Sequence, residues 1–136
     1  MAIFSSSGSE ACDVALSIFS EFGPFITLEG AYHGLTGQYL KKISLDEFKY
    51  KSKFIASFPM DKSSFGKLKE LAEKGAKSII IEIIQVESGI REVYEEFIKD
   101  LIKNFPELII FVDESYTGIG KNGKLFSYQW YDFVLD

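Results

Sequence analysis

The stretch "LIIFVDESYTGIG" (Leu108–Gly120) joins an apolar run to a loop rich in acids and glycine. Five consecutive apolar residues, Leu108–Val112, are typical of a strand that is buried on both faces of a parallel sheet. Asp113 follows this run directly, so we expect it to emerge at the carboxyl end of the strand. Ligands bind at that edge in open parallel sheets. The stretch therefore predicts an α/β fold in which Asp113 belongs to the binding site.

The rest of the chain alternates between strand and helix patterns. Strands are expected at the apolar runs Met1–Phe4, Phe25–Glu29, Ser78–Ile84 and Leu108–Val112. Helices are expected where apolar residues recur at helical spacing, at Ser7–Phe22, Ser63–Gly75 and Arg91–Phe105. The expected inward face of the first helix is Ala11, Val14, Ala15, Ile18 and Phe22. Residues from about Ser44 to Lys62 are expected to be irregular. This order predicts three layers, with a mostly parallel sheet covered by helices on both faces.

Size and composition limit the class of protein. A length of 136 residues suits one domain, spanning 1–136, and is too short for two ordinary ones. A net charge of -5 provides no basic surface for nucleic acid or an anionic membrane. The apolar runs are too short to cross a bilayer, and the first residues do not form a signal peptide. Cys12 is the only cysteine, which excludes an internal disulfide and favours a reducing cytoplasm.

Glycine and polar residues gather where each expected strand ends. Near the start, "SSSGSEA" (Ser5–Ala11) leads into a helix, whose first amides and dipole favour a phosphate at Ser7–Ser9. The alternative is a plain helix start, because Ser7 and Glu10 have the spacing of a capping box. Both interpretations stay open from these residues alone.

The second strand is followed by "EGAYHG" (Glu29–Gly34). Tyr32 between two glycines could lie flat on an aromatic ligand, or it could be a half-buried aromatic in an ordinary turn. His33 is the only histidine, so a multi-histidine metal site is excluded and no metal is expected.

Acidic residues follow the last two strands. Glu82 lies inside an apolar run, where a carboxylate must be paired or hydrogen-bonded, and Glu87 follows in the next loop. Two such acids suggest general acid–base chemistry, although a solvated loop is the usual explanation. Asp113 could be a helix cap or an ordinary loop acid, or it could pair with a protonated heterocyclic nitrogen and hold that ring in an electron-poor form.

Taken together, these stretches resemble the class III aminotransferases of the ornithine and 4-aminobutyrate type, which use pyridoxal phosphate. Four family motifs are matched in order and in spacing across nearly the whole chain. They are N-[ST]-G-[ST]-E-A at Ser6–Ala11, G-A-Y-H-G at Gly30–Gly34, E-P-I-Q-G-E-G-G at Glu82–Gly89 and D-E-V-Q-T-G-x-G-R-T-G-K-L-F at Asp113–Phe126. The resemblance implies the large domain of a fold type I pyridoxal-phosphate transferase, of which this chain would be an incomplete, central part.

The resemblance also implies roles for the matched positions. The cofactor phosphate would be held at Ser7, Gly8 and Ser9. Tyr32 would stack on the pyridine ring, and Asp113 would be the catalytic carboxylate that pairs with the ring nitrogen. Glu82 and Glu87 match family acids near the cofactor and the substrate, and His33 and Tyr116 would complete the surroundings of the cofactor. The substrates implied are an amino donor and a 2-oxo acid, and we expect a homo-oligomer in the cytoplasm.

Several positions depart from the family motifs. Tyr116 replaces a glutamine that lies near the hydroxyl group of the pyridine ring in the family. Ser6 replaces an asparagine, Ile83 replaces a proline and Val86 replaces a glycine. The lysine that forms the Schiff base, and an arginine that commonly receives a substrate carboxylate, lie in the family beyond the position of Leu135–Asp136. The resemblance therefore implies a fragment or truncated relative that is inactive as an isolated chain. The alternative is a non-catalytic descendant that binds a small molecule or a partner protein.

Overall fold

A computed structural model describes residues 2–34, 55–56 and 64–131. Three α-helices occur in these ranges, α1 (Gly8–Ser20), α2 (Ser64–Glu73) and α3 (Glu95–Asn104). The strands are β1 (Phe25–Leu28), β2 (Ile55–Ala56), β3 (Ser78–Ile81), β4 (Ile84–Gln85), β5 (Arg91–Glu92) and β6 (Ile109–Val112). A short 3-10 helix, η2, covers Ser127–Trp130. No helix within the described ranges is long and apolar enough to span a membrane.

The main sheet is parallel throughout, in the order β2-β1-β3-β6. In the centre of the sheet, Ile80 lies between Thr27 of β1 and Phe111 of β6. Because all four strands run the same way, their carboxyl ends meet at one edge. That edge receives the loops that begin at Glu29, Glu82 and Asp113.

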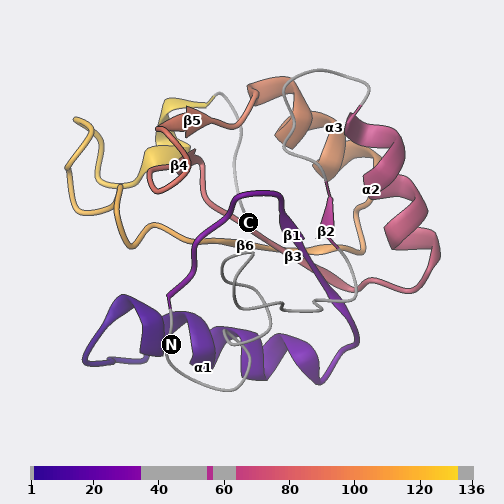
Figure 1. Cartoon of the computed structure of the whole chain (residues 1–136), viewed down its shortest axis with the longest axis horizontal. Coiled ribbons are helices and arrows are strands. Elements are labelled where there is room, and N and C mark those ends of the chain that lie inside the picture. Colours follow the sequence, from indigo (N-terminus) through magenta and orange to yellow (C-terminus); the bar gives the residue numbers. More distant parts are fainter. Residues whose placement is uncertain (1, 35–54, 57–63, 132–136) are drawn as a thin grey trace.

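Helices cover both faces of this sheet, as Figure 1 shows with α1 on one side and α2 and α3 on the other. The larger core packs Ile79 and Ile81 against Leu68 of α2 and Phe97 of α3. Ile80 points to the opposite face, because side chains alternate along a strand. There it packs with residues of α1 in a smaller core. The predicted three-layer α/β architecture is therefore confirmed.

The buried face of α1 is not the predicted one. Cys12 and Leu16 are buried beside Ile80, whereas Ala11 and Ile18 are exposed. Both sets of residues recur at helical spacing, so periodicity alone did not separate them. The helix itself forms as expected, because Ser7 caps its amino terminus.

Three other local predictions were wrong. Residues 2–4 join no strand, and the irregular stretch contains β2 at Ile55–Ala56. Apart from those two residues, the stretch Ser44–Lys62 lies outside the described residues, as does the loop from residue 35 onward. The third helix begins at Glu95 rather than Arg91, because Arg91–Glu92 pairs antiparallel with Ile84–Gln85 as a small hairpin.

Candidate functional site

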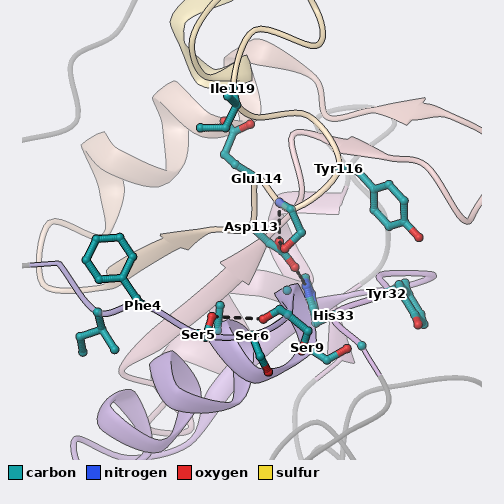
Figure 2. Close-up of a pocket in the computed structure, with 16 residues that line it drawn as sticks. Phe4, Ser5, Ser6, Ser9, Tyr32, His33, Asp113, Glu114, Tyr116 and Ile119 are labelled. Atoms are coloured by element: carbon teal, nitrogen blue, oxygen red, sulfur yellow. Dashed lines mark hydrogen bonds and ion pairs between the residues drawn. The ribbon is translucent and has the colours of Figure 1, made fainter.

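A cleft of ≈ 830 Å³ opens at the carboxyl edge of the sheet, beside the start of α1. Figure 2 shows Ser9, from the start of α1, and the preceding Ser6 below Asp113, with Tyr32 and Tyr116 both to the right of Asp113 in this view. The volume of the cleft lies within the range of small-molecule sites. Seven of the predicted site residues line it: Ser7, Gly8, Ser9, Tyr32, His33, Asp113 and Tyr116. Glu82 is not among the lining residues.

The amino terminus of α1 forms one end of the cleft. The Ser7 hydroxyl accepts a hydrogen bond of 3.2 Å from the Glu10 amide, so one half of the predicted capping box is present. Glu10 does not complete the box, because its carboxylate accepts hydrogen bonds from the amide and hydroxyl of Ser6 instead. Gly8 and Ser9 occupy the first two helical positions, whose amides have no carbonyl one turn earlier to bond. These amides and the helix dipole suit an anion.

The loop after β1 forms the neighbouring wall. Tyr32 is half-buried and lines the cleft, while His33 is buried beneath it. Gly34 has a φ of +100°, and a Cβ atom there would lie 2.6 Å from the Ser9 Cβ and closer still to its hydroxyl. Only glycine fits this conformation and this close approach. Gly34 therefore lets the Tyr32 loop reach the start of α1.

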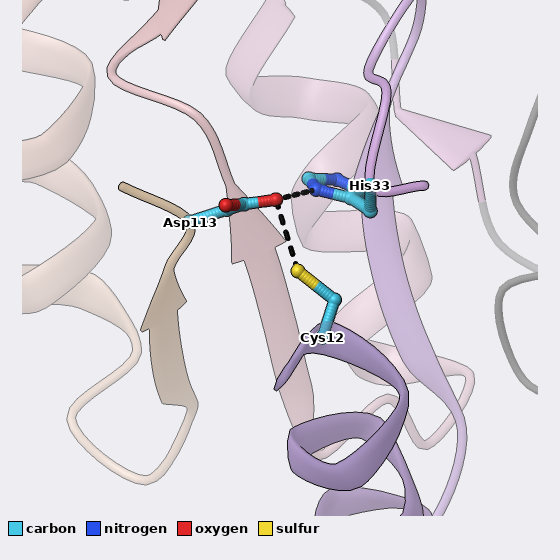
Figure 3. Close-up of side chains that lie close together, drawn as sticks. All are labelled: Cys12, His33 and Asp113. Carbon is cyan, nitrogen blue, oxygen red and sulfur yellow. Dashed lines mark hydrogen bonds and ion pairs between the residues drawn. The ribbon is translucent and has the colours of Figure 1, made fainter. Parts of the chain in front are cut away.

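Asp113 also lines the cleft, and it is held by side chains from three segments of the chain, two of which Figure 3 shows. Its Oδ2 atom is 2.7 Å from His33 Nδ1 and accepts from the Cys12 thiol at 3.2 Å. Its Oδ1 atom accepts from the amide and the hydroxyl of Ser115, at 3.0 and 2.6 Å. Burial opposes ionisation, yet the hydrogen bonds and charge of His33 and the bonds from Ser115 lower the Asp113 pKa to about 2. An ionised carboxylate only accepts, so His33 carries its proton on Nδ1.

Glu82 holds the Tyr32 loop through a hydrogen bond to its backbone. Its carboxylate is 3% exposed and accepts a hydrogen bond of 2.8 Å from the Tyr32 amide. Burial raises the pKa of Glu82 to about 7, although His33 and the Tyr32 amide act in the opposite direction. Glu82 therefore contacts the backbone of a cleft residue rather than the cleft itself.

Tyr116 and Glu87 meet at the rim. The Tyr116 hydroxyl donates to the Glu87 carboxylate at 2.9 Å, and this bond raises the pKa of Tyr116. The Tyr116 ring is 42% exposed and lines the cleft together with Tyr32. The site thus has two tyrosines on one side.

Three residues near the site were not identified from the sequence. The signal for Cys12 is its spacing, because it lies four residues after Gly8 and hence on the same side of α1. Ser115 follows Asp113 by two residues, but its residue type alone indicates no role. Helical spacing predicts Arg91 in a helix, whereas its guanidinium donates to the Glu29 carbonyl and to Gln85, at 3.0 and 2.7 Å.

The donor set fits pyridoxal phosphate. The cleft contains the amino terminus of α1, which suits an anion, and an ionised, buried carboxylate. Gly8 lies so close to Ser115 that an added Cβ would be 2.9 Å from its hydroxyl, so the helix terminus adjoins the segment that begins at Asp113. Half-buried aromatic surface from Tyr32 lies beside them. A phosphate, a protonated ring nitrogen and a flat ring would each find a suitable partner.

Comparisons with known proteins point the same way. No protein-family model matches the sequence. An acetylornithine aminotransferase of Aquifex aeolicus is 28% identical over 98% of this chain and 39% of its own length. A [LysW]-aminoadipate semialdehyde/glutamate semialdehyde transaminase of Sulfolobus acidocaldarius is 32% identical over 99% of this chain and 36% of its own.

Solved structures agree with the sequence relatives. An S-selective transaminase from Bacillus megaterium is 25% identical and superposes with a TM-score of 0.76, over 97% of this chain and 37% of its own. The chain thus spans less than two fifths of the length of each of these proteins. The chain is therefore related, by sequence and by fold, to the class III pyridoxal-phosphate-dependent aminotransferases.

Proposed function

We propose that residues 1–136 carry part of the pyridoxal-phosphate site of an aminotransferase, which moves an amino group between an amino acid or amine and a 2-oxo acid. One observation carries the proposal. A single cleft brings the amino terminus of α1 next to Asp113, which is buried and ionised. An anion site beside a carboxylate that selects a protonated ring nitrogen suits this cofactor better than a simple phosphate ester.

The proposed roles follow from the geometry. The Gly8 and Ser9 amides, with the Ser7 and Ser9 hydroxyls nearby, bind the phosphate. Asp113 binds the protonated ring nitrogen, and His33 orients Asp113. When bound, pyridoxal phosphate supplies an electron-poor ring that stabilises negative charge on the substrate carbon next to the amino nitrogen. Tyr32 covers one face of the ring and helps exclude water, and Tyr116 lies beside it at the rim.

We also propose how the 136-residue polypeptide behaves as a whole. In the family that the chain resembles, the reactive lysine lies beyond the positions matched here, so we propose that the 136-residue polypeptide alone does not turn over. We also propose a cytoplasmic homo-oligomer, and the single free thiol of Cys12 is compatible with a reducing compartment. A non-catalytic descendant that binds phosphorylated small molecules is the second candidate, because the helix terminus alone would serve it.

A binding experiment separates the two candidates. Pyridoxine 5'-phosphate has the ring and the phosphate but no aldehyde, so surface lysines cannot trap it. Calorimetric titration compares it with inorganic phosphate, for the wild type, for Asp113→Asn and for the control Asp100→Asn on α3. We expect wild type and control to bind pyridoxine 5'-phosphate more tightly than phosphate, and Asp113→Asn to lose that difference. Equal affinity for both ligands in the wild type would favour the non-catalytic candidate.

A further inference from the structure

The carboxylate of Asp113 is held by four donors, and one of them is a thiol (Figure 3). His33 and Cys12 both donate to Oδ2, at 2.7 and 3.2 Å. The amide and hydroxyl of Ser115 occupy Oδ1. His33, Ser115 and Asp113 line the cleft, whereas Cys12 does not and is 2% exposed. Cys12 therefore does not border the cleft itself, and its thiol reaches it through Asp113.

The position of Cys12 on α1 explains the role of its contact with Asp113. Cys12 lies four residues after Gly8, so both residues are on the same side of the helix. Gly8 lies against Ser115, because an added Cβ would be 2.9 Å from the Ser115 hydroxyl. One turn later, the Cys12 thiol reaches Asp113. The helix is thus docked on the Asp113–Ser115 segment by two contacts one turn apart.

We propose that Cys12 is a positioning residue, whose thiol fixes the Asp113 carboxylate relative to the amino terminus of α1. The inference rests on the proposed function, in that it sets how the ring-nitrogen end of the cofactor site lies relative to the phosphate end. A cofactor that binds at both ends depends on this relation, whereas a free phosphate depends on the helix terminus alone.

The thiol acts as a donor here, and not merely as a small apolar side chain. Burial raises the pKa of the Cys12 thiol well above its ordinary value, and the neighbouring Asp113 charge adds to the effect. The sulfur therefore keeps its proton and directs it to an ionised acceptor. Its oxygen counterpart in a serine could do the same, whereas an alanine or a valine could not.

The test uses His33 as its probe. His33 is the only histidine, so one imidazole signal in the NMR spectrum reports on the Asp113 cluster. The variants are Cys12→Ala, which removes the donor, Cys12→Ser, which keeps one, and Cys12→Val, which fills the space without one. Ser17→Ala is the control, since the Ser17 hydroxyl bonds the Val14 carbonyl within α1. A chelator in all samples prevents metal ions from bridging Cys12, His33 and Asp113.

The first measurement needs no ligand. With one donor fewer on Oδ2, the bond from His33 Nδ1 should shorten. We therefore expect the Nδ1 proton resonance to move downfield in Cys12→Ala and Cys12→Val, and to return towards its wild-type position in Cys12→Ser. The Ser17→Ala control should leave it in place. An Nδ1 proton that stays in place in every variant would overturn the inference.

The second measurement compares the two ligands. We expect Cys12→Ala to weaken binding of pyridoxine 5'-phosphate about three- to tenfold, the range for one lost hydrogen bond to a buried group. Binding of inorganic phosphate should change by less than about twofold, and Cys12→Ser should recover most of the loss. Equal losses for both ligands, with no recovery in Cys12→Ser, would reduce Cys12 to a packing residue. If the wild type does not bind pyridoxine 5'-phosphate, the proposed function fails, while the His33 signal still decides the role of Cys12.

Discussion

The backbone amide of Tyr32 donates a hydrogen bond of 2.8 Å to Glu82, a carboxyl group that is 3% exposed. The Tyr32 loop, which lines the cleft, is thereby tied to a buried acid that directly follows β3. Burial raises the pKa of this acid to about 7, so its charge changes near neutral pH. The position of Tyr32 and the protonation of Glu82 are therefore linked.

Stability should fall as the pH rises towards neutrality. The ordinary pKa of Glu82, 4.5, applies to the unfolded chain and about 7 to the folded one, so the folded state binds more protons between these values. The free energy of unfolding then decreases as pH rises through this window, by up to about 3 kcal/mol. Glu82→Gln keeps an acceptor for the Tyr32 amide without the charge. We expect this variant to lack the decrease in urea unfolding between pH 4.5 and 8, and to exceed the wild type at pH 8.

One variant serves as a control for this pH effect, and one other group has the opposite pH dependence. Glu96→Gln removes an exposed carboxylate of α3 and should leave the decrease unchanged. Asp113 acts in the opposite direction at lower pH, because its pKa falls from 3.8 to about 2 on folding. Its contribution is present above pH 4 and is lost as pH falls towards 2. A Glu82→Gln variant with the wild-type pH profile would assign the decrease to another group.

Tyr32 should contribute stacking to ligand binding. We expect Tyr32→Ala to weaken binding of pyridoxine 5'-phosphate by about 1 kcal/mol, or roughly fivefold, because the ring loses an aromatic face. Tyr32→Phe keeps that face and should bind as the wild type does. Inorganic phosphate, titrated in parallel, should show no difference among the three proteins. A Tyr32→Phe variant as weak as Tyr32→Ala would instead assign the effect to the hydroxyl.

The 136-residue polypeptide should show no transaminase turnover with any pair of amino donor and 2-oxo acid. Nucleophilic catalysis through a lysine and general-base transfer of the substrate proton would both be missing. After incubation with pyridoxal phosphate and borohydride reduction, mass analysis should find adducts scattered over several lysines, among them Lys121 and Lys124. A single stoichiometric adduct at one lysine, abolished by Asp113→Asn, would show that a substitute reactive lysine exists.

The apolar groove beside α1 should promote self-association. It has a volume of ≈ 360 Å³ and is lined in part by Ile3, by Ile18 of α1 and by Phe111 of β6. Phe4 beside it is 96% exposed and Phe22 is 58% exposed. Apolar surface of this kind favours contact between molecules. Sedimentation velocity should show association that increases with concentration, and Phe4→Ser with Ile18→Ser should shift it towards monomer.

The matched control for association is Leu125→Ser in the loop after β6. This variant removes an apolar side chain that is 56% exposed, between the exposed fractions of Ile18 and Phe4. It should leave the sedimentation profile unchanged. An equal shift in this variant would mean that exposed apolar groups act without regard to their place on the surface.

The sheet and the cleft could be predicted because their signals are local. Apolar runs such as Ile79–Ile81 are buried from both faces, and Asp113 emerges where its strand ends. The serine- and glycine-rich helix start lies in the same cleft as Asp113, as the order of strands and helices implied. These features depend on short stretches and on the general rule for parallel sheets.

Features that depend on distant partners could not be predicted. Two apolar stripes compete on α1, and Cys12 and Leu16 are buried because Ile80 and Asp113 lie opposite them. Helical spacing continues back to Arg91, but its bonds to Glu29 and Gln85 hold that residue in the hairpin instead. In both cases tertiary contacts outweigh local periodicity, which is a weak preference.

The contacts around Asp113 have a consequence for how the chain folds. Asp113 meets His33 across 80 residues of sequence and Cys12 across 101. Forming contacts between residues this far apart in sequence costs chain entropy, because a long loop must be closed. Such contacts slow folding when they must form early. The cluster can be complete only when β1, β3 and β6 are already side by side. A ligand that requires the cluster binds only the folded protein. It should therefore raise the midpoint of thermal unfolding in proportion to the logarithm of the ligand concentration.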